Sequence, residues 1–348
     1  MNPTSVCAWV THEKGRTMKP RLSWEKITLK LQNPFRLSYG TTEERQASWI
    51  RLAEDAGWGE GTIPPYYHVD QSVTEALWQK ASESKIPFPN SIDEISNWVG
   101  MEGPAVARCA LDLALHDRIG RLTGQPLYQL LGLPRPASLK TSFTIAVDTP
   151  KAMAAMALKF INFTILKIKL AGDGQDIARL AAIRAARPDV KLRVDANAGW
   201  KAEDAVVLVH DLERFDLEMI EQPVAKDDIA GMGIVQAFAK IPIVADESVQ
   251  TIEDIEALAR VGVKAINLKL MKAGGLTPAV TMLKRARELG LQVMLGCMIE
   301  TSIGATAMAH LAGLADWLDL DAPLLISNDP FDGLTIDDSA TVTIPERP

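Results

Sequence analysis

Charged residues recur near the ends of short apolar segments in the second half of the sequence, where a purely structural strand would carry valine, isoleucine or leucine. They are Lys167, Lys169, Asp195, Glu221, Asp246, Lys269, Asp319 and Asp321. One or two such residues would be ordinary ion pairs. A set spread over six of eight candidate strands predicts one shared site.

Asp195, Glu221 and Asp246 follow one another at intervals of about 25 residues. If each interval is one strand and one helix, the three carboxylates project from neighbouring parallel strands toward one point. Hard oxygen ligands without cysteine or histidine suit Mg²⁺, with water or substrate as the remaining ligands. A cluster paired with lysines alone is the alternative, although arginine pairs carboxylates better. The sequence therefore predicts a Mg²⁺ site.

Lys169 and Lys269 lie on strands expected on opposite sides of this site. A lysine crowded by another cation, such as Lys167 or Mg²⁺, is expected to have a lowered pKa and to act as a general base. One base on each side of a substrate, with a metal for the developing oxyanion, suits removal of a proton α to a carboxylate. Schiff-base chemistry is the rival interpretation, but it leaves the three acids unexplained.

Asp319 and Asp321 flank Leu320 in the stretch "ADWLDLDAPLL". On a strand, residues two apart share a face, so the two carboxylates would repel each other unless a cation lies between them. We therefore expect a cationic group at this pair. The alternatives are a solvated or helix-capping pair and a second metal site.

From about residue 139, strands and helices alternate, and these are the elements that must position the charged residues. Eight β-rich runs, separated by helical stretches, lie at 141–147, 165–170, 191–197, 217–223, 242–248, 265–270, 292–298 and 317–322. Eight parallel strands with helical crossovers close most economically as a (β/α)₈-type barrel, whose active site lies at the C-terminal ends of the strands. An open doubly wound sheet is the alternative, but no glycine-rich phosphate loop follows the first run.

The first part of the chain has a different order of predicted strands and helices. Residues 20–60 alternate as strands, with "AGWGEG" as a turn, and helical periodicity follows at 72–81, 91–100 and 104–124. This order predicts a small α+β domain.

The composition bounds the class of protein. The chain has 348 residues, 47% of them hydrophobic, and a net charge of −7, which argues against nucleic acid as a partner. No apolar run is long enough for a membrane span or resembles a signal core. Cys7, Cys109 and Cys297 form no paired framework, so we expect a cytoplasmic protein in a reducing compartment.

Several motifs together resemble the muconate-lactonising-enzyme subgroup of the enolase superfamily, over residues 18 to about 345. They are "PF" (34–35), "GWGEG" (57–61), "ALDLALHDRIGRLTGQPLYQLLG" (110–132), "KIK" (167–169), "DANAGW" (195–200), "EQP" (221–223), "ADES" (245–248), "NLKLMKAGG" (267–275) and "GCMIE" (296–300). The resemblance implies a modified TIM barrel, (β/α)₇β, under an N-terminal α+β capping domain. We predict an extension at 1–17, the cap at 18–135, the barrel at 136–325 and a C-terminal segment at 326–348 that returns to the cap.

The resemblance also implies roles for the charged residues. It implies that the metal is bound by Asp195, Glu221 and Asp246. Lys169 and Lys269 would be the two acid/base residues, and Lys167 would contact the substrate carboxylate. Lys272 is expected to be structural. The mandelate-racemase subgroup would need a histidine at a barrel strand end, and the five histidines of this chain include none there.

The aspartate pair resembles the dipeptide epimerases, in which it holds the ammonium of the substrate. This implies inversion of the α-carbon of the C-terminal residue by two-base proton transfer through an enediolate. Further weak substrate contacts are implied for Thr144, Cys297 and Ile299. The alternatives are an o-succinylbenzoate synthase, an N-acylamino acid racemase and a muconate cycloisomerase-like lyase. A homo-oligomer is expected.

Two loops of the cap, 33–45 and 62–71, are the candidates for setting the side-chain preference, but the sequence does not fix that preference. Gly40 stands where Ala-Glu epimerases have a glutamate-reading arginine, and neither Arg36 nor Arg45 matches that position. Tyr39, Tyr66 and Tyr67 are candidates either for binding a hydrophobic side chain or for packing between the domains.

Overall fold

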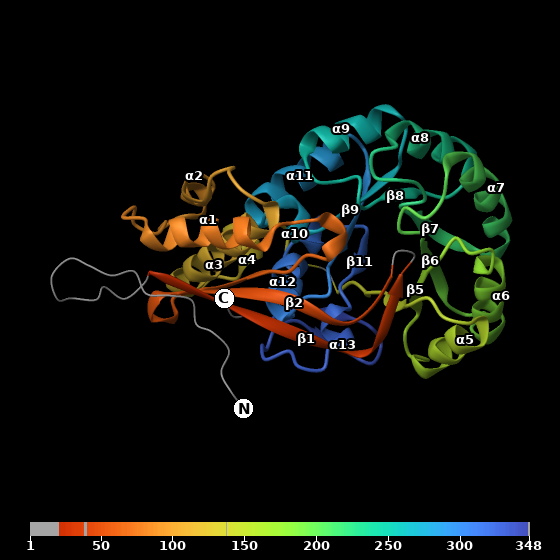
Figure 1. Ribbon diagram of the computed structural model, residues 1–348, viewed down its shortest axis with the longest axis horizontal. Helices are drawn as coiled ribbons and strands as arrows, with labels where there is room; N and C mark the ends of the chain where they lie inside the picture. Colours follow the sequence, from red (N-terminus) through yellow and green to blue (C-terminus); the bar gives the residue numbers. More distant parts are fainter. Residues whose placement is uncertain (1–20, 38–39, 137, 347–348) are drawn as a thin grey trace.

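The computed structural model describes residues 21–37, 40–136 and 138–346. The predicted extension at 1–17, Cys7 and Tyr39 lie outside the described residues. Two layers of different character pack side by side: an antiparallel sheet with its helices, and a ring of parallel strands enclosed by helices (Figure 1).

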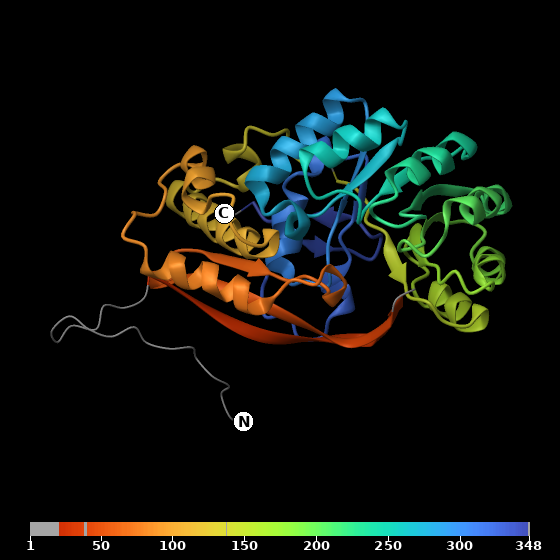
Figure 2. The ribbon, with the colours of Figure 1, turned by 45° about the horizontal axis from the view of Figure 1, so that its top comes forward.

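The cap is built on the sheet β1 (Leu22–Leu37), β2 (Gly40–Leu52) and β3 (Trp58–Gly61), in that spatial order. Its helices are α1 (Gln71–Glu83), α2 (Ile95–Val99), α3 (Ala105–Thr123) and α4 (Leu127–Leu130). The β1–β2 ribbon reaches from the cap across the barrel (Figure 2), where the amide of Val147 donates to the carbonyl of Arg36 at 3.1 Å. The cap therefore covers one end of the barrel.

The segment predicted as the turn "AGWGEG" contains strand β3 instead. A Cβ at Gly59 would collide with the backbone of α3 at Ala110, and one at Gly61 would approach the carbonyl of Val106 to 2.9 Å. The glycines thus serve a close approach of strand to helix.

All eight predicted barrel strands are present, each somewhat shorter than its run. They are β4 (Phe143–Ile145), β5 (Ile165–Lys169), β6 (Lys191–Asp195), β7 (Leu217–Glu221), β8 (Ile243–Ala245), β9 (Ala265–Leu268), β10 (Gln292–Gly296) and β11 (Trp317–Asp319). Neighbours in sequence are neighbours in the sheet and pair in parallel. A bridge between Thr141 and Leu318 joins the last strand to the first. The ring is therefore closed.

Helices cover the outside of the ring (Figure 1). They are α5 (Pro150–Lys159), α6 (Asp176–Ala186), α7 (Ala202–Leu212), α8 (Ile229–Phe238), α9 (Ile252–Arg260), α11 (Leu276–Glu288) and α12 (Ser302–Ala309), with the short α10 (Leu270–Ala273) and α13 (Ala322–Leu325) near the strand ends. Seven strand–helix units followed by a final strand confirm the predicted (β/α)₇β fold. None of the helices in the described ranges is long and apolar enough to cross a membrane.

The C-terminal segment returns to the cap. Ile326 bridges Leu31 of β1, and the amide of Ser327 donates to the carbonyl of Lys30 at 2.9 Å. Phe331 then meets Trp58 edge to face, with 5.5 Å between ring centroids. The remaining hairpin, β12 (Thr335–Ile336) and β13 (Val342–Thr343), packs at the start of the barrel domain. The exact domain bounds stay a prediction.

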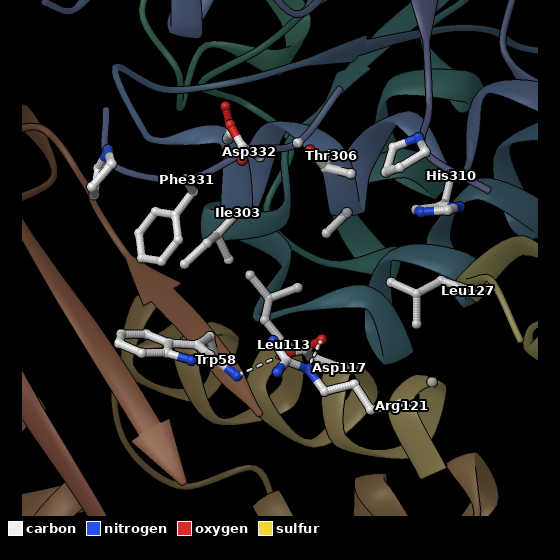
Figure 3. Close-up of a pocket in the computed structure, with 16 residues that line it drawn as sticks. Trp58, Leu113, Asp117, Arg121, Leu127, Ile303, Thr306, His310, Phe331 and Asp332 are labelled. Carbon is white, nitrogen blue, oxygen red and sulfur yellow. Dashed lines mark hydrogen bonds and ion pairs between the residues drawn. The ribbon is translucent and has the colours of Figure 1, made fainter. Parts of the chain in front are cut away.

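A cavity of about 640 Å³ lies between α3, α12 and the C-terminal segment. Figure 3 shows Trp58 and Phe331 at one end of it and His310 and Leu127 at the other. Its described lining includes none of the charged residues predicted for the site. The chemistry therefore has to be sought at the barrel mouth, under the cap.

Candidate active site

The strand ends bring three carboxylates together. Asp195 and Glu221 are the last residues of β6 and β7 and pair in register, and Asp246 directly follows β8. All three are buried, and one oxygen from each lies within 4.8 Å of the others. The set of oxygen donors and their spacing fit a hard divalent cation.

Three lysines surround the triad of Asp195, Glu221 and Asp246. The Lys167 ammonium lies 2.6 Å from Glu221 and 3.1 Å from Asp195. Lys169, two residues along the same face of β5, lies 2.6 Å from Asp195. Lys269, just after β9, approaches from the other side and lies 2.8 Å from Asp246. The two predicted bases therefore stand on opposite sides of the triad.

Negative charge is concentrated where the triad meets. Burial raises the pKa of Glu221 to about 8, and the charge of Asp195 adds to the shift. Burial also acts to raise the pKa of Asp195, but Lys169 and Lys167 outweigh it and lower this pKa. A cation bound among the three carboxylates would offset the burial and the repulsion that together raise the pKa of Glu221.

Lys269, one of the lysines predicted to be crowded by cations, also lies against an acid. Burial does act to lower the pKa of Lys269, but the charge of Asp246 outweighs it and raises the pKa. The pKa of Lys167 is raised in the same way, chiefly by Asp319 and Glu221. The sequence could indicate that the lysines lie close to one another, but it could not show how close each lysine lies to a carboxylate.

The two aspartates at the eighth strand lie at the mouth of the ring, but only Asp319 belongs to β11. Asp319 accepts from Lys167 at 2.8 Å and from the hydroxyl of Ser142 at 2.6 Å. Asp321, beyond the strand end, accepts from the amide of Thr144 at 2.6 Å. Lys167 is thus a cation beside the first acid.

The two acids differ in their titration. Burial acts to raise the pKa of Asp319, but the charge and hydrogen bond of Lys167 lower it to about 2. Burial and the charge of Asp319 together raise the pKa of Asp321 to about 7. A second cation at Asp321 would stabilise its charged form.

Supporting residues hold the carboxylates in place. Lys272 donates to Asp246 at 2.5 Å, which fits the structural role expected for it. Asn267 donates its amide to Glu221 at 2.8 Å. Asn267 falls within a quoted motif, but its role was missed, because a polar residue inside a strand does not reveal its partner in the sequence.

The cap closes over the site and leaves a cavity of about 70 Å³. Thr144, Cys297 and Ile299, predicted as weak substrate contacts, all line it. Residues of the two cap loops predicted at 33–45 and 62–71 also line it, namely Phe35, Leu37, Arg45 and Pro64. Leu325 from α13, which the prediction did not include, lines it as well.

The cap residues considered for side-chain preference separate in the structure. Arg45 is buried at the cavity, whereas Arg36 points outward and lies 3.3 Å from Asp148. Tyr67 lines the cavity, and Tyr66 packs edge to face against Tyr67, with 5.4 Å between centroids. Of the two tyrosines, Tyr67 therefore lies where it could contact a substrate, and Tyr66 packs behind it.

Two family models match the chain. Residues 24–132 match the mandelate racemase/muconate lactonizing enzyme N-terminal domain, and residues 151–348 match the enolase C-terminal domain-like model. The chain belongs to this family. The resemblance inferred from its motifs is thereby confirmed.

Known relatives share most of the chain. It is 33% identical to the L-Ala-D/L-amino acid epimerase of Maribacter sp. HTCC2170, covering 93% of this chain and 96% of the relative. It is 35% identical to the L-Ala-D/L-Glu epimerase of Bacillus subtilis 168, covering 94% of each. The dipeptide epimerase of Enterococcus faecalis V583, solved with Mg and L-Leu-L-Tyr, superposes with a TM-score of 0.87 at 31% identity, covering 94% and 97% of the two chains. The predicted class, an isomerase acting on amino acid derivatives, is confirmed.

Proposed function

We propose that the protein is a Mg²⁺-dependent dipeptide epimerase that inverts the α-carbon of the C-terminal residue. The observation that carries this proposal is the placement of Lys169 and Lys269 on opposite sides of one buried acidic triad. The epimerase relatives and the dipeptide-bound neighbour support it. A homo-oligomer remains part of the proposal.

The residues of the triad fit the metal. Asp195, Glu221 and Asp246 would hold Mg²⁺, because they offer only carboxylate oxygens and Glu221 resists ionisation without a further cation. When bound, Mg²⁺ would neutralise the negative charge that develops on the substrate carboxylate.

The lysines carry the proton transfer. Lys167 contacts the substrate carboxylate, while Lys169 and Lys269 face the two sides of the α-carbon. One lysine removes the α-proton to give the enediolate of the substrate, and the other returns a proton to the opposite face. The product is the epimer at the second residue.

The mouth residues orient the dipeptide. Asp319 and Asp321 accept from its ammonium, and Thr144, Cys297 and Ile299 line the space beside it. The same two acids would repel the diacid substrates of an o-succinylbenzoate synthase or a muconate cycloisomerase. They favour a substrate with a free amino group over those alternatives and over an N-acylamino acid.

The test is deuterium uptake. In deuterated water with Mg²⁺, the protein should exchange the α-proton of the second residue of some members of an L,L-dipeptide library and form the L,D epimer. Proton NMR of the α-position measures both. The double variant Lys169→Ala with Lys269→Ala is the control and should show neither. Absence of exchange across the whole library would overturn the proposal.

A further inference from the structure

The cavity at the barrel mouth is too small for a whole dipeptide. Its volume of about 70 Å³ corresponds to roughly two water molecules at ~30 Å³ each. The carboxylate and ammonium of the substrate are accounted for by the charged residues around it. The two side chains of a dipeptide therefore need adjoining space.

A second cavity of about 190 Å³ adjoins the first and shares three lining residues with it, Phe35, Thr144 and Leu325. It lies between the end of the β1–β2 ribbon, strand β4 and helix α5. We call it the side cavity. The shared residues place it directly beside the proposed active site, and its volume is the room that a side chain would need.

The side cavity lies next to the proposed ammonium site. Asp321 accepts from the amide of Thr144 at 2.6 Å, and Thr144 lines both cavities. In a dipeptide the ammonium and the side chain of the first residue share one carbon atom. An ammonium held at Asp321 therefore places the first side chain within reach of the side cavity.

The lining of the side cavity is mainly apolar. Its apolar lining includes Ala146, Met153, Met156, Phe160 and Leu324. Methionine side chains are flexible and polarisable, and they adapt to apolar groups of different shape.

The charges at its edge are already paired with each other. Arg36 and Asp148, which also line the side cavity, lie 3.3 Å apart and are half exposed. The lining thus offers an apolar side chain favourable burial, while its two charged residues already pair with each other.

We infer that the side cavity binds the side chain of the N-terminal residue, so that the enzyme prefers dipeptides whose first residue is a medium-sized aliphatic or thioether residue, such as leucine or methionine. This inference rests on the proposed function and specifies its substrate class. Glycine and alanine at the first position would leave the cavity unfilled and forfeit the burial.

The experiment compares dipeptides that differ only in the first residue. The series Gly-X, Ala-X, Leu-X and Met-X is assayed with Mg²⁺, where X is the second residue that exchanges fastest in the library. We expect kcat/KM for Leu-X and Met-X to exceed that for Ala-X by at least about tenfold, as for added methylenes in an apolar enzyme pocket.

Three variants locate the effect. Ala146→Leu, which fills the side cavity, should lower the Leu-X to Ala-X ratio of kcat/KM by about tenfold, mainly through KM. Met156→Ala, which enlarges it, should shift the preference toward Phe-X. Ala155→Leu is the matched control, because Ala155 is an exposed residue of the same helix outside the described lining. It should leave both rates unchanged.

The outcomes are distinguishable. A flat first-residue series in the wild type, or a Leu-X to Ala-X ratio that Ala146→Leu leaves unchanged, would overturn the inference while the epimerase itself stands. Exchange with no dipeptide at all would overturn the proposed function and the inference with it.

Discussion

At the residue scale, the two lysines are distinguished by the side from which they approach. Lys169 pairs with Asp195 at 2.6 Å, and Lys269 pairs with Asp246 at 2.8 Å, on separate strands of the ring. In the proposed mechanism, the α-proton of one epimer faces one lysine, and the α-proton of the other epimer faces the other lysine. Each lysine should therefore serve one epimer as base.

This asymmetry predicts the behaviour of Lys169→Ala. Interconversion should fall by about 10²- to 10⁴-fold, the range for a lost general acid–base group. Exchange with deuterated water should persist for the single epimer whose α-proton faces Lys269. NMR of the L,L and L,D dipeptides, assayed separately, measures this selectivity.

The reciprocal variant is the control for the lysine prediction. Lys269→Ala should retain exchange of the opposite epimer only. If each variant lost exchange of both epimers equally, the two-base assignment would be contradicted. A Mg²⁺ titration of both variants checks that the loss does not come from a disturbed triad.

The sequence indicated these residues because their charge is out of place on barrel strands. It brought Arg45 into consideration but could not show that Arg45 is buried at the cavity, because this depends on which face of β2 is turned to the barrel. It also could not show how close Lys269 lies to Asp246, whose charge raises the pKa of this lysine.

At the element scale, periodicity predicted the barrel well. Helix–strand alternation is a local pattern, and every one of the eight runs contains a strand. Strand β3 was missed because its glycines are explained only by the contact with α3. The alternating pattern also could not show that β11 ends at Asp319, two residues before Asp321.

The end of α12 carries a prediction about pH. His310 follows this helix and lines the cavity of Figure 3. A helix C-terminus favours a charged histidine, but burial dominates and lowers the pKa of His310 to about 4. The folded protein thus holds His310 neutral, whereas the unfolded chain takes up a proton near its ordinary pKa of 6.5.

The sign follows from the lowered folded-state pKa. The contribution of His310 to stability is complete above pH 6.5 and is lost as the pH falls toward 4. At pH 5 the loss should be about 2 kcal/mol, at ~1.36 kcal/mol for each pKa unit. Urea unfolding of the wild type and of His310→Gln at pH 7.5 and pH 5 measures it.

The comparison between proteins isolates this histidine from the other acids that titrate in the same range. His310→Gln should lose about 2 kcal/mol less than the wild type between the two pH values. An equal loss in both proteins would show that His310 is protonated in the folded state or accessible to water.

At the scale of the whole molecule, the cap and the barrel enclose a site rich in like charges. The sequence predicted the barrel, the cap and the ring of charges, because each leaves a local signal. It did not predict how the β1–β2 ribbon crosses the mouth, since this depends on contacts between distant segments such as Arg36 and Val147. The room for substrate side chains was therefore visible only in the structure.

Binding of Mg²⁺ should stabilise the folded protein as a whole, because the unfolded chain cannot bring the triad together. The gain is about 2.7 kcal/mol when free Mg²⁺ is one hundred times its Kd. Thermal unfolding with EDTA and then with increasing Mg²⁺ measures it as a rising Tm. NaCl at matched ionic strength controls for screening of surface charges.

Glu221→Gln is the variant that makes this stability test decisive. Glutamine keeps an acceptor for Asn267, which donates to Glu221 at 2.8 Å, but removes one charge of the triad. Without Mg²⁺ the variant should be at least as stable as the wild type, since burial and Asp195 already hold the pKa of Glu221 at about 8. With Mg²⁺ its Tm should rise far less. An equal rise in both proteins would place the stabilising cation elsewhere than at the triad.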